Sequence, residues 1–180
     1  MNEKQKLPIS IVKIMKGGKK LAKLTEEMKA VLKIVGKGGA VVHLTTCSVD
    51  GVPNIVAERF ITHYKDEYIL IGEMFAQKTK VNLNENEIGC LSIAHPVKKN
   101  TWVFRGPCTI ICHAAPSNYK WHDIKAGDVL AEWGEWATKE PPDEVPPDIA
   151  PPKLAQRGLI VLKVDEVYSF SPEEAGKKIL

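Results

Sequence analysis

The chain has 180 residues, which is enough for one domain of ordinary size whose hydrophobic core needs no disulfide or metal. Its apolar fraction of 44% and charged fraction of 26% are typical of a globular protein in water. The net charge of +3 is small for a protein that binds nucleic acid, and no run of about 18 apolar residues is present to cross a membrane. We therefore expect neither nucleic acid nor a membrane as a partner.

The five histidines and four cysteines do not show the spacing of a metal site. Cys108 and Cys112 lie four positions apart without a Cys-x-x-Cys pair, and Cys47 and Cys90 each stand inside an apolar run. A free cysteine usually packs as a small hydrophobe, so we expect buried, reduced thiols and no metal. No apolar signal segment opens the chain, and the expected compartment is the cytoplasm.

A helix is predicted to begin after Thr25, a residue that can cap it, with Glu26 and Glu27 favourably placed at its positive end. Apolar residues then recur at helical spacing as far as the glycine-rich residues 36–39. The Lys-rich residues before this helix are expected to be a solvated lead-in, 1–24, which precedes one domain at 25–180.

Six strands are predicted from short apolar runs that are separated by turn residues. Residues 40–47 and 53–61 are expected to form a hairpin, because the Asp-Gly pair between them suits the tight turns that join antiparallel strands. The other four runs are 68–73, 88–95, 101–113 and 158–170. Pro107 has no backbone donor, which predicts a bulge or an edge position within the fifth strand.

Four other segments have different patterns. Residues 77–86 predict a short helix with Asn86 as a left-handed end. The Trp-rich residues 117–138 predict a longer helix that is broken or bent near Gly127. The sequence KEPPDEVPPDIAPPK at 139–153 has six prolines in fifteen residues, which predicts an extended surface strap. The tail, 171–180, starts with a capping-box pattern and predicts a short helix.

Together these elements predict a mainly β fold with flanking helices, in which six antiparallel strands form a small closed or split β-barrel. The Trp-rich helix and the Pro-rich strap would be an insertion in the single domain, at about 117–153. Short strands joined by hairpin turns do not favour a parallel sheet.

The best candidate for a binding site lies in the sequence FAQKTKVN, residues 75–82. Lys78 and Thr79 fall in the first turn of the predicted short helix, where unpaired N–H groups and the helix dipole attract an anion. A lysine charge and a hydroxyl donor would complete a phosphate site, although an ordinary solvated helix fits the same local pattern. No Gly-x-Ser-x-Gly elbow, Gly-x-Gly-x-x-Gly loop or P-loop is present to indicate another site.

Three blocks of the chain, taken in order, resemble the pyridoxamine 5'-phosphate oxidase-like family of FMN-binding split barrels. The first block is LTEEMKAVLK followed by AVVHLTTCSVDGVPNIVAERFI, with its Asp-Gly turn. The second is ILIGEMFAQKTKVNLNENEIGCLSI, which contains the Lys-Thr pair, and the third is WVFRGPCTI, which contains an Arg-Gly pair. The resemblance covers residues 24–113 and the last predicted strand.

The resemblance implies a homodimer that holds two FMN molecules in clefts between its subunits. Lys78 and Thr79 would hold the phosphate, the strand Val56–Arg59 would lie along the isoalloxazine ring, and Ile71 and Gly72 would lie beneath the ribityl chain. The predicted cofactor-binding residues are Val56, Ala57, Glu58, Arg59, Ile71, Gly72, Gln77, Lys78 and Thr79. The flavin would carry the redox chemistry, so no catalytic acid or base is predicted.

The function that the resemblance implies is an FMN-dependent oxidoreductase with a small-molecule redox substrate that the sequence does not identify. The chain ends in SPEEAGKKIL and lacks the basic, Trp-containing end of the true vitamin B6 oxidases, so a true pyridoxamine-phosphate oxidase is not expected. A deazaflavin (F420) or FAD in place of FMN, and a non-catalytic flavin-binding electron carrier, remain alternatives. So does a small β-barrel module that binds nucleic acid or a partner chain through its basic N-terminal segment and exposed aromatic residues.

Overall fold

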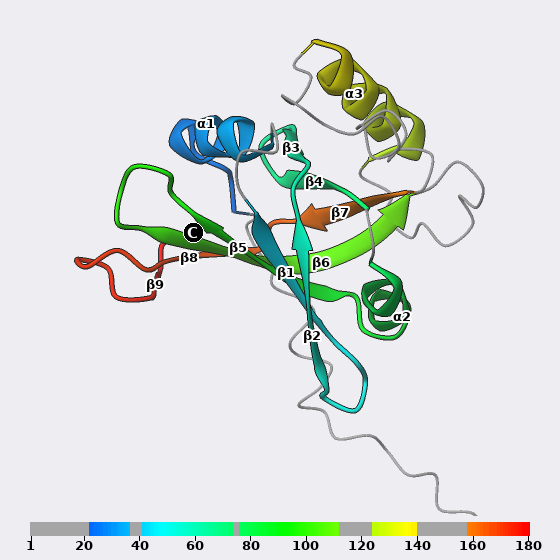
Figure 1. The fold of residues 1–180 in the computed structure, drawn as a ribbon, viewed down its shortest axis with the longest axis horizontal. Coiled ribbons are helices and arrows are strands. Elements are labelled where there is room, and N and C mark those ends of the chain that lie inside the picture. Colours follow the sequence, from blue (N-terminus) through cyan, green and yellow to red (C-terminus); the bar gives the residue numbers. More distant parts are fainter. Residues whose placement is uncertain (1–21, 37–40, 74–75, 112–123, 140–157) are drawn as a thin grey trace, which may run out of the picture.

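The computed structural model of the protein describes residues 22–36, 41–73, 76–111, 124–139 and 158–180, and Figure 1 shows their arrangement. The helices are α1 (Glu26–Ile34), α2 (Gln77–Glu85) and α3 (Ala126–Lys139). The strands are β1 (Val42–Cys47), β2 (Pro53–Glu58), β3 (Ile61–Tyr64), β4 (Tyr68–Gly72), β5 (Ile88–Ala94), β6 (Thr101–Ile111), β7 (Leu159–Lys163), β8 (Glu166–Ser169) and β9 (Lys177–Lys178).

Every strand pair within these ranges is antiparallel, and the strands follow the order β2-β1-β5-β6-β7-β4-β3, with β8 beside β6 and β9 beside β8. The long strand β6 joins two sheets. Its first half pairs with β5 and β8, and its second half pairs with β7. This arrangement confirms the prediction of a mainly β, antiparallel fold with flanking helices.

The Arg-Gly-Pro sequence in β6 marks the place where the strand changes partner from β8 to β7. A Cβ atom at Gly106 would lie 1.9 Å from the carbonyl oxygen of Lys163, so only glycine lets the two backbones approach so closely. Pro107 pairs with Ile88 on one side and with no described strand on the other. It therefore has the one-sided edge position that a residue without an N–H requires.

Two of the predicted strands are each divided in two, so the prediction of one continuous strand at 53–61 and at 158–170 is wrong. In the first, β2 ends at Glu58 and the chain then forms β3, which pairs with β4 and not with β1. In the second, β7 ends and the N–H of Asp165 donates to the carbonyl oxygen of Arg105 at 3.0 Å, after which β8 joins β6. Hydrophobic periodicity continues through both corners, and only the pairing of distant strands sets the breaks.

The helix predictions are confirmed in part. Thr25 caps α1, because its Oγ1 accepts a hydrogen bond from the Met28 N–H at 3.2 Å. The short helix α2 is present, but Asn86 after it is extended, with φ of −139°, so the predicted left-handed end is wrong. The predicted helix over 117–138, with a break or bend near Gly127, is confirmed in its second part: α3 begins at Ala126, and Ile124 and Lys125 lie outside it. Residues 117–123 lie outside the described ranges.

The tail does not form the predicted helix. Ser171 Oγ accepts the Glu174 N–H at 3.1 Å, as a capping residue should. Ala175 and Gly176 then have φ of 46° and 81°, which turns the chain back before a second helical turn can form. The next two residues form β9 instead of a helix.

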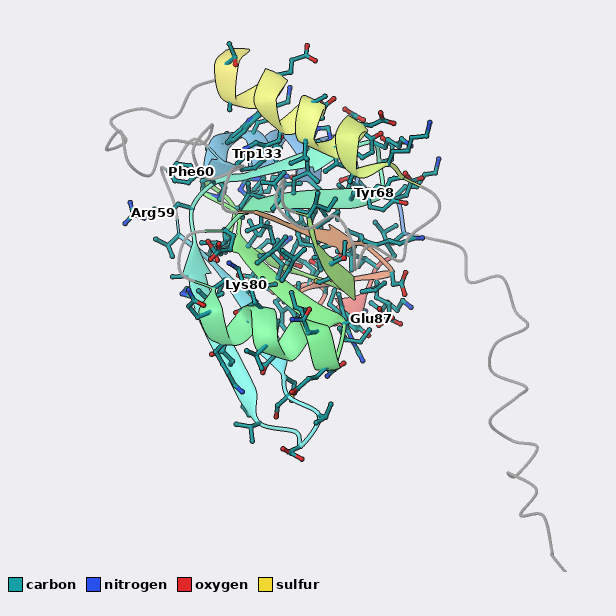
Figure 2. The ribbon with its side chains drawn as sticks, turned by 90° about the vertical axis from the view of Figure 1, so that its right-hand side faces the viewer. Arg59, Phe60, Tyr68, Lys80, Glu87 and Trp133 are labelled. Atoms are coloured by element: carbon teal, nitrogen blue, oxygen red, sulfur yellow. The ribbon has the colours of Figure 1, made fainter. Side chains whose placement is uncertain are left out.

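Two hydrophobic clusters hold the described elements together. One fills the barrel and includes residues of α1, and the other lies between α3 and the sheet of β3, β4 and β7. Trp133 of α3 is fully buried in the second cluster, and Figure 2 shows it beneath the helix near Phe60. Burial of a side chain of this size is a major contribution to stability, on the order of 3 kcal/mol. This cluster positions α3 on the sheet.

Several predictions concern residues that the structure does not describe. Trp121, Cys112 and residues 140–153 of the Pro-rich strap lie outside the described ranges. Of the cysteines within those ranges, Cys108 is buried, whereas Cys47 and Cys90 are half-buried. None of the helices in the described part of the chain has the length and apolarity that crossing a bilayer requires.

Candidate functional site

The first turn of α2 is open to solvent on one side. Its N-cap residue, Ala76, offers no side-chain hydrogen bond to the helix, and Gln77 and Lys78 are exposed. The first N–H groups of a helix have no partner within the helix, and the helix dipole favours an anion there. Lys78 therefore adds a positive charge to a place that already attracts a phosphate.

Thr79 lies on the inner side of the same turn. It is 1% exposed, and its Oγ1 accepts a hydrogen bond from Asn54 Nδ2 at 3.0 Å. Because the amide is the donor, the Thr79 hydroxyl retains its own hydrogen for a further bond. The structure thus brings Lys78 to the surface and Thr79 to the contact between α2 and β2.

Two more side-chain bonds attach α2 to β1. Asn82 Nδ2 donates to Thr46 Oγ1 at 3.1 Å, and Asn86 Nδ2 donates to the carbonyl oxygen of Cys47 at 3.2 Å. Asn82 is fully buried, and its Oδ1 has no partner in the part of the chain that the structure describes. These contacts give the helix a fixed position on the β1–β2 hairpin, so its first turn has a fixed place at the barrel surface.

The strand that was predicted to lie along the flavin ring alternates between two faces. Ala57 and Arg59 are exposed, Val56 is half-buried and Glu58 is fully buried. Figure 2 shows Arg59 projecting away from the barrel just beyond β2. The backbone near Ala57 and the side chain of Arg59 are therefore available to a ligand, whereas the side chain of Glu58 is not.

The end of β4 lies against the link between β2 and β3. Gly72 N–H donates to the carbonyl oxygen of Phe60 at 2.9 Å, which joins the two segments. Ile71 is fully buried in the barrel cluster, so its side chain faces the core and is not open to a ligand. Since α2 contacts β2, the predicted residues come from three neighbouring segments: the end of β2, the end of β4 and the first turn of α2.

Glu58 has a carboxyl group inside the protein. The residue is 0% exposed, and neither carboxyl oxygen has a hydrogen-bond partner among the residues that the structure describes. Burial, and after it the nearby charge of Glu73, raises the pKa of Glu58 from 4.5 to about 8. Glu58 is therefore mainly neutral at pH 7.

Glu73 follows β4 directly, and each of its two carboxyl oxygens binds a residue at the start of α2. Its Oε1 accepts the Ala76 N–H at 2.9 Å, and its Oε2 lies 2.8 Å from Lys80 Nζ. Glu73 is 3% exposed, and the side chain of Lys80 is 31% exposed. One buried carboxylate therefore fixes the turn that carries Lys78.

Sequence reasoning missed Glu73 and Lys80 as parts of this site. A signal was present, because Glu73 follows the fully buried strand Tyr68–Gly72 without an intervening turn residue. An acidic residue in that position must be paired or neutral, since an isolated buried charge is costly. The pairing partner, seven positions later on a helix, follows no simple sequence rule.

Other candidate sites are less complete. Among the described residues, no three His, Cys, Asp or Glu side chains lie close enough together to hold a metal ion. Cys112, His113 and His122 lie outside those residues, as does the basic segment before Ala22.

A curated relative matches almost the whole chain, although no family model matches it. The relative is the uncharacterized protein MJ0282 of Methanocaldococcus jannaschii, which is 30% identical over 167 residues. The match covers 90% of this chain and 91% of the relative.

Solved structures share the fold at lower identity. HupZ of Group A Streptococcus has a TM-score of 0.58 and 16% identity, over 87% of this chain and 99% of HupZ. An FMN-binding protein of Syntrophomonas wolfei has a TM-score of 0.51 and 14% identity, over 81% of this chain and 85% of its own. A proposed pyridoxamine 5'-phosphate oxidase of Lactobacillus delbrueckii has a TM-score of 0.51 and 18% identity, over 81% and 93%. These likenesses confirm the predicted split-barrel fold.

Proposed function

The chain belongs to the family of the Methanocaldococcus jannaschii protein MJ0282 and has the pyridoxamine 5'-phosphate oxidase-like split-barrel fold, and from this premise we propose that it is an FMN-dependent oxidoreductase. The observation that carries the proposal is the open first turn of α2, where the exposed Lys78 stands beside uncapped N–H groups. These features fit a phosphate dianion. The Syntrophomonas wolfei protein of the same fold is described as FMN-binding, which supports a flavin as the molecule that carries the phosphate.

The phosphate would be held by Lys78 and by the N–H groups of Gln77–Thr79. The buried Thr79 side chain would contribute by fixing the turn on β2 through Asn54. Arg59, exposed beyond the end of β2, would supply a second positive charge. Two cations and a helix N-terminus are a suitable complement for a group that carries up to two negative charges.

The flavin ring would lie along β2, where the backbone of Val56 and Ala57 would meet its polar edge. Gly72 would leave space for the ribityl chain at the end of β4. Glu58 and Ile71 would contribute only through their backbone, because both side chains are buried. The bound flavin would supply the redox chemistry, and the protein would orient it and exclude water.

A direct test is the colour and mass of whatever copurifies with the protein. We expect a yellow protein that releases FMN on denaturation, and mass spectrometry of the released molecule distinguishes FMN from FAD or a deazaflavin. A colourless protein that does not bind added FMN in a titration would contradict the proposal.

Replacement of Lys78 tests the phosphate site itself. Lys78→Ala is expected to weaken FMN binding about tenfold to a hundredfold, because one charge-assisted contact contributes roughly 1.5–3 kcal/mol. Riboflavin, which lacks the phosphate, should bind wild type and variant equally. Lys177→Ala, which removes an exposed lysine from β9, is the matched control and should leave FMN affinity unchanged.

We also propose that the flavin lies between the subunits of a homodimer. The outward face of β2 leaves Ile55 65% exposed, and Ile88 at the start of β5 is 41% exposed. The opposite face of the hairpin packs against α2 through Thr46 and Asn54. An apolar sheet face of this kind suits a protein interface. Light scattering should give the mass of a dimer, and Ile55→Asp should give a monomer that retains less flavin.

Steady-state assays separate an enzyme from an electron carrier. An oxidoreductase should turn over NADH or NADPH with a small acceptor faster than free FMN does. A protein that binds FMN but gives no such turnover would be the non-catalytic flavin carrier.

A further inference from the structure

We infer that Glu58 and Glu73 are positioning residues for the first turn of α2, and that the proton on Glu58 controls how firmly this turn is held. The effect on FMN affinity rests on the function proposed above, whereas the effect on the turn itself does not. The two glutamates are called the acidic pair below.

The geometry of the acidic pair makes it a connection between β2, β4 and α2. Glu73 accepts the Ala76 N–H and pairs with Lys80 Nζ, which ties the end of β4 to α2. Glu58 lies at the end of β2, near the backbone bond from Gly72 to Phe60 that joins this segment to β4, and neither of its carboxyl oxygens has a partner within the described ranges. An unpaired buried polar group is unusual in a folded protein and calls for an explanation.

The charges of the cluster balance only when Glu58 is protonated. Glu73 and Lys80 then form one neutral pair, and Glu58 is neutral beside it. β1 presents the uncharged Val42 opposite Glu58, and Arg59 and Lys78 are exposed. Loss of the proton therefore adds one uncompensated negative charge in a place where both glutamates are less than 4% exposed.

An ionised Glu58 would repel Glu73, whose nearby charge already disfavours the ionisation of Glu58. This repulsion would weaken the hold of Glu73 on the turn that presents Lys78. The same charge would also oppose the binding of a phosphate dianion close by.

The relevant pH range follows from the observed burial. Burial raises the pKa of Glu58 to about 8, so the proton is mostly present at pH 7 and mostly absent at pH 9. The turn is therefore expected to be firm near neutral pH and to loosen as pH rises past 8.

Hydrogen exchange of the protein without flavin tests this directly. The protection factors of the backbone amides of Lys80 and the next turn of α2, corrected for the intrinsic effect of pH, should fall between pH 7 and pH 9. The expected fall is up to about tenfold for each pH unit above the transition. Amides of β4 and β7, in the buried sheet, should keep their protection and serve as an internal reference.

Two variants make the test specific. Glu58→Gln keeps the shape of the side chain but cannot ionise, so α2 protection should be the same at both pH values. Glu85→Gln removes a negative charge from the exposed end of the same helix and should keep the wild-type pH response. A wild-type α2 that is equally protected at pH 7 and pH 9, or a Glu58→Gln variant that loses protection like wild type, would overturn the inference.

The wild-type profile is decisive even if Glu58→Gln does not fold. In wild type, ¹³C-labelled glutamate should show one carboxyl carbon that titrates near pH 8, in step with the loss of α2 protection. A loss of protection that follows no glutamate titration would also overturn the inference.

FMN titrations separate this inference from the proposed function. If both hold, FMN affinity should fall between pH 7 and pH 9 in wild type and stay constant in Glu58→Gln, while riboflavin affinity changes in neither. If the protein binds no flavin but α2 protection depends on Glu58, the proposed function fails and the positioning role stands. If FMN binds with an affinity that ignores Glu58 and α2 protection is constant, the positioning role fails and the function stands.

Discussion

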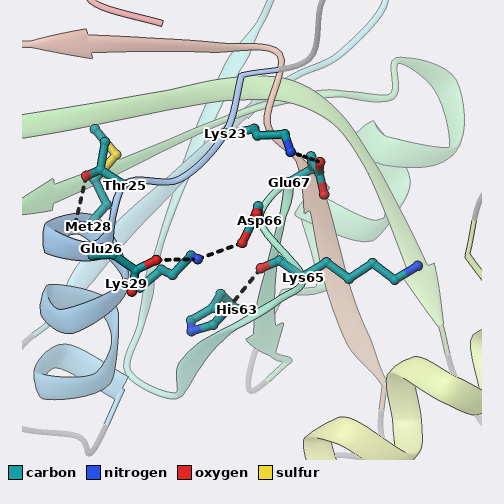
Figure 3. A network of polar contacts seen from close by, with 9 residues as sticks. All are labelled: Lys23, Thr25, Glu26, Met28, Lys29, His63, Lys65, Asp66 and Glu67. Carbon is teal, nitrogen blue, oxygen red and sulfur yellow. Dashed lines mark hydrogen bonds and ion pairs between the residues drawn. The ribbon is translucent and has the colours of Figure 1, made fainter.

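The beginnings of α1 and α2 differ, although both helices have nine residues. α1 satisfies its own first turn: Thr25 caps it, and Glu26 and Glu27 complement its dipole. Figure 3 shows this turn joined to the β3–β4 turn by Lys29, whose Nζ lies 2.6 Å from Asp66 Oδ1 and 2.8 Å from Glu26 Oε1.

α2 has none of these features. Its N-cap is an alanine, no acidic residue stands in its first turn, and Lys78 adds a positive charge where a negative one would be stabilising. Its support comes instead from Glu73, a residue outside the helix. A helix start that is left incomplete by its own residues but is fixed by the rest of the fold is suited to a ligand. A helix start that is complete serves stability alone.

Removal of the Glu73 carboxylate should remove this support, and of the losses of stability predicted here it should be the largest. In Glu73→Gln, the Lys80 ammonium loses its partner and the Ala76 N–H loses a charged acceptor. The free energy of unfolding, measured by urea denaturation, should fall by about 2–4 kcal/mol. Glu85→Gln on the exposed end of α2 is the control, and its effect should stay within about 0.5 kcal/mol. Equal effects of the two variants would mean that Glu73 does not hold α2.

Glu58→Gln should raise the free energy of unfolding, whereas Glu73→Gln should lower it. The folded-state pKa of about 8 lies above the unfolded value of 4.5, so the folded protein binds more protons than the unfolded chain between these values. Wild-type stability therefore falls as pH rises from about 4.5 to 8. The variant lacks this loss and should be more stable at pH 7, on the order of 3 kcal/mol. Urea denaturation at several pH values measures the difference, and parallel pH profiles for the two proteins would contradict it.

Thr25→Ala tests the other side of the comparison. It removes the acceptor of the Met28 N–H and should lower the free energy of unfolding by about 1 kcal/mol. FMN affinity should not change, because α1 takes no part in the proposed site. Thr25→Ser keeps the hydroxyl, so it should keep most of the stability that Thr25→Ala loses. Equal losses in both variants would assign the effect to the threonine methyl group.

The cap of α1 was predictable because its signals lie within a few positions of one another. The hairpin around Asp50 and Gly51 was predictable for the same reason, and Gly51 has the φ of 83° that such a turn needs. The exposed face of the α2 turn also followed from the local pattern at Lys78. In each case residues close together in the sequence determine the local backbone conformation, so the sequence alone was sufficient for the prediction.

The strand breaks and the acidic pair were not predictable in this way. The break after Glu58 arises because β3 pairs with β4 and not with β1. Hydrophobic periodicity within one segment does not report which strand that segment will pair with. The place of Glu73 depends on its contacts with Ala76 and Lys80, and the place of Glu58 depends on the pairing of β2 with β1. Sequence periodicity reports which residues face inward, but it does not report which polar groups meet there.

Asp66→Asn should have the smallest effect, because the Asp66 side chain is exposed and Lys29 keeps Glu26 as its other partner. Lys29 holds the pKa of Asp66 below its ordinary value of 3.8, so the pair contributes at neutral pH and is lost as pH falls below that value. The variant should lose less stability than Thr25→Ala, and the loss should shrink at high salt because exposed charges are screened. Glu173→Gln, an exposed acidic residue in the tail, is the control and should show no such salt dependence. A loss that is the same at low and high salt would mean that Asp66 stabilises α1 by its shape and not by its charge, and the two helix starts would then differ only in their caps.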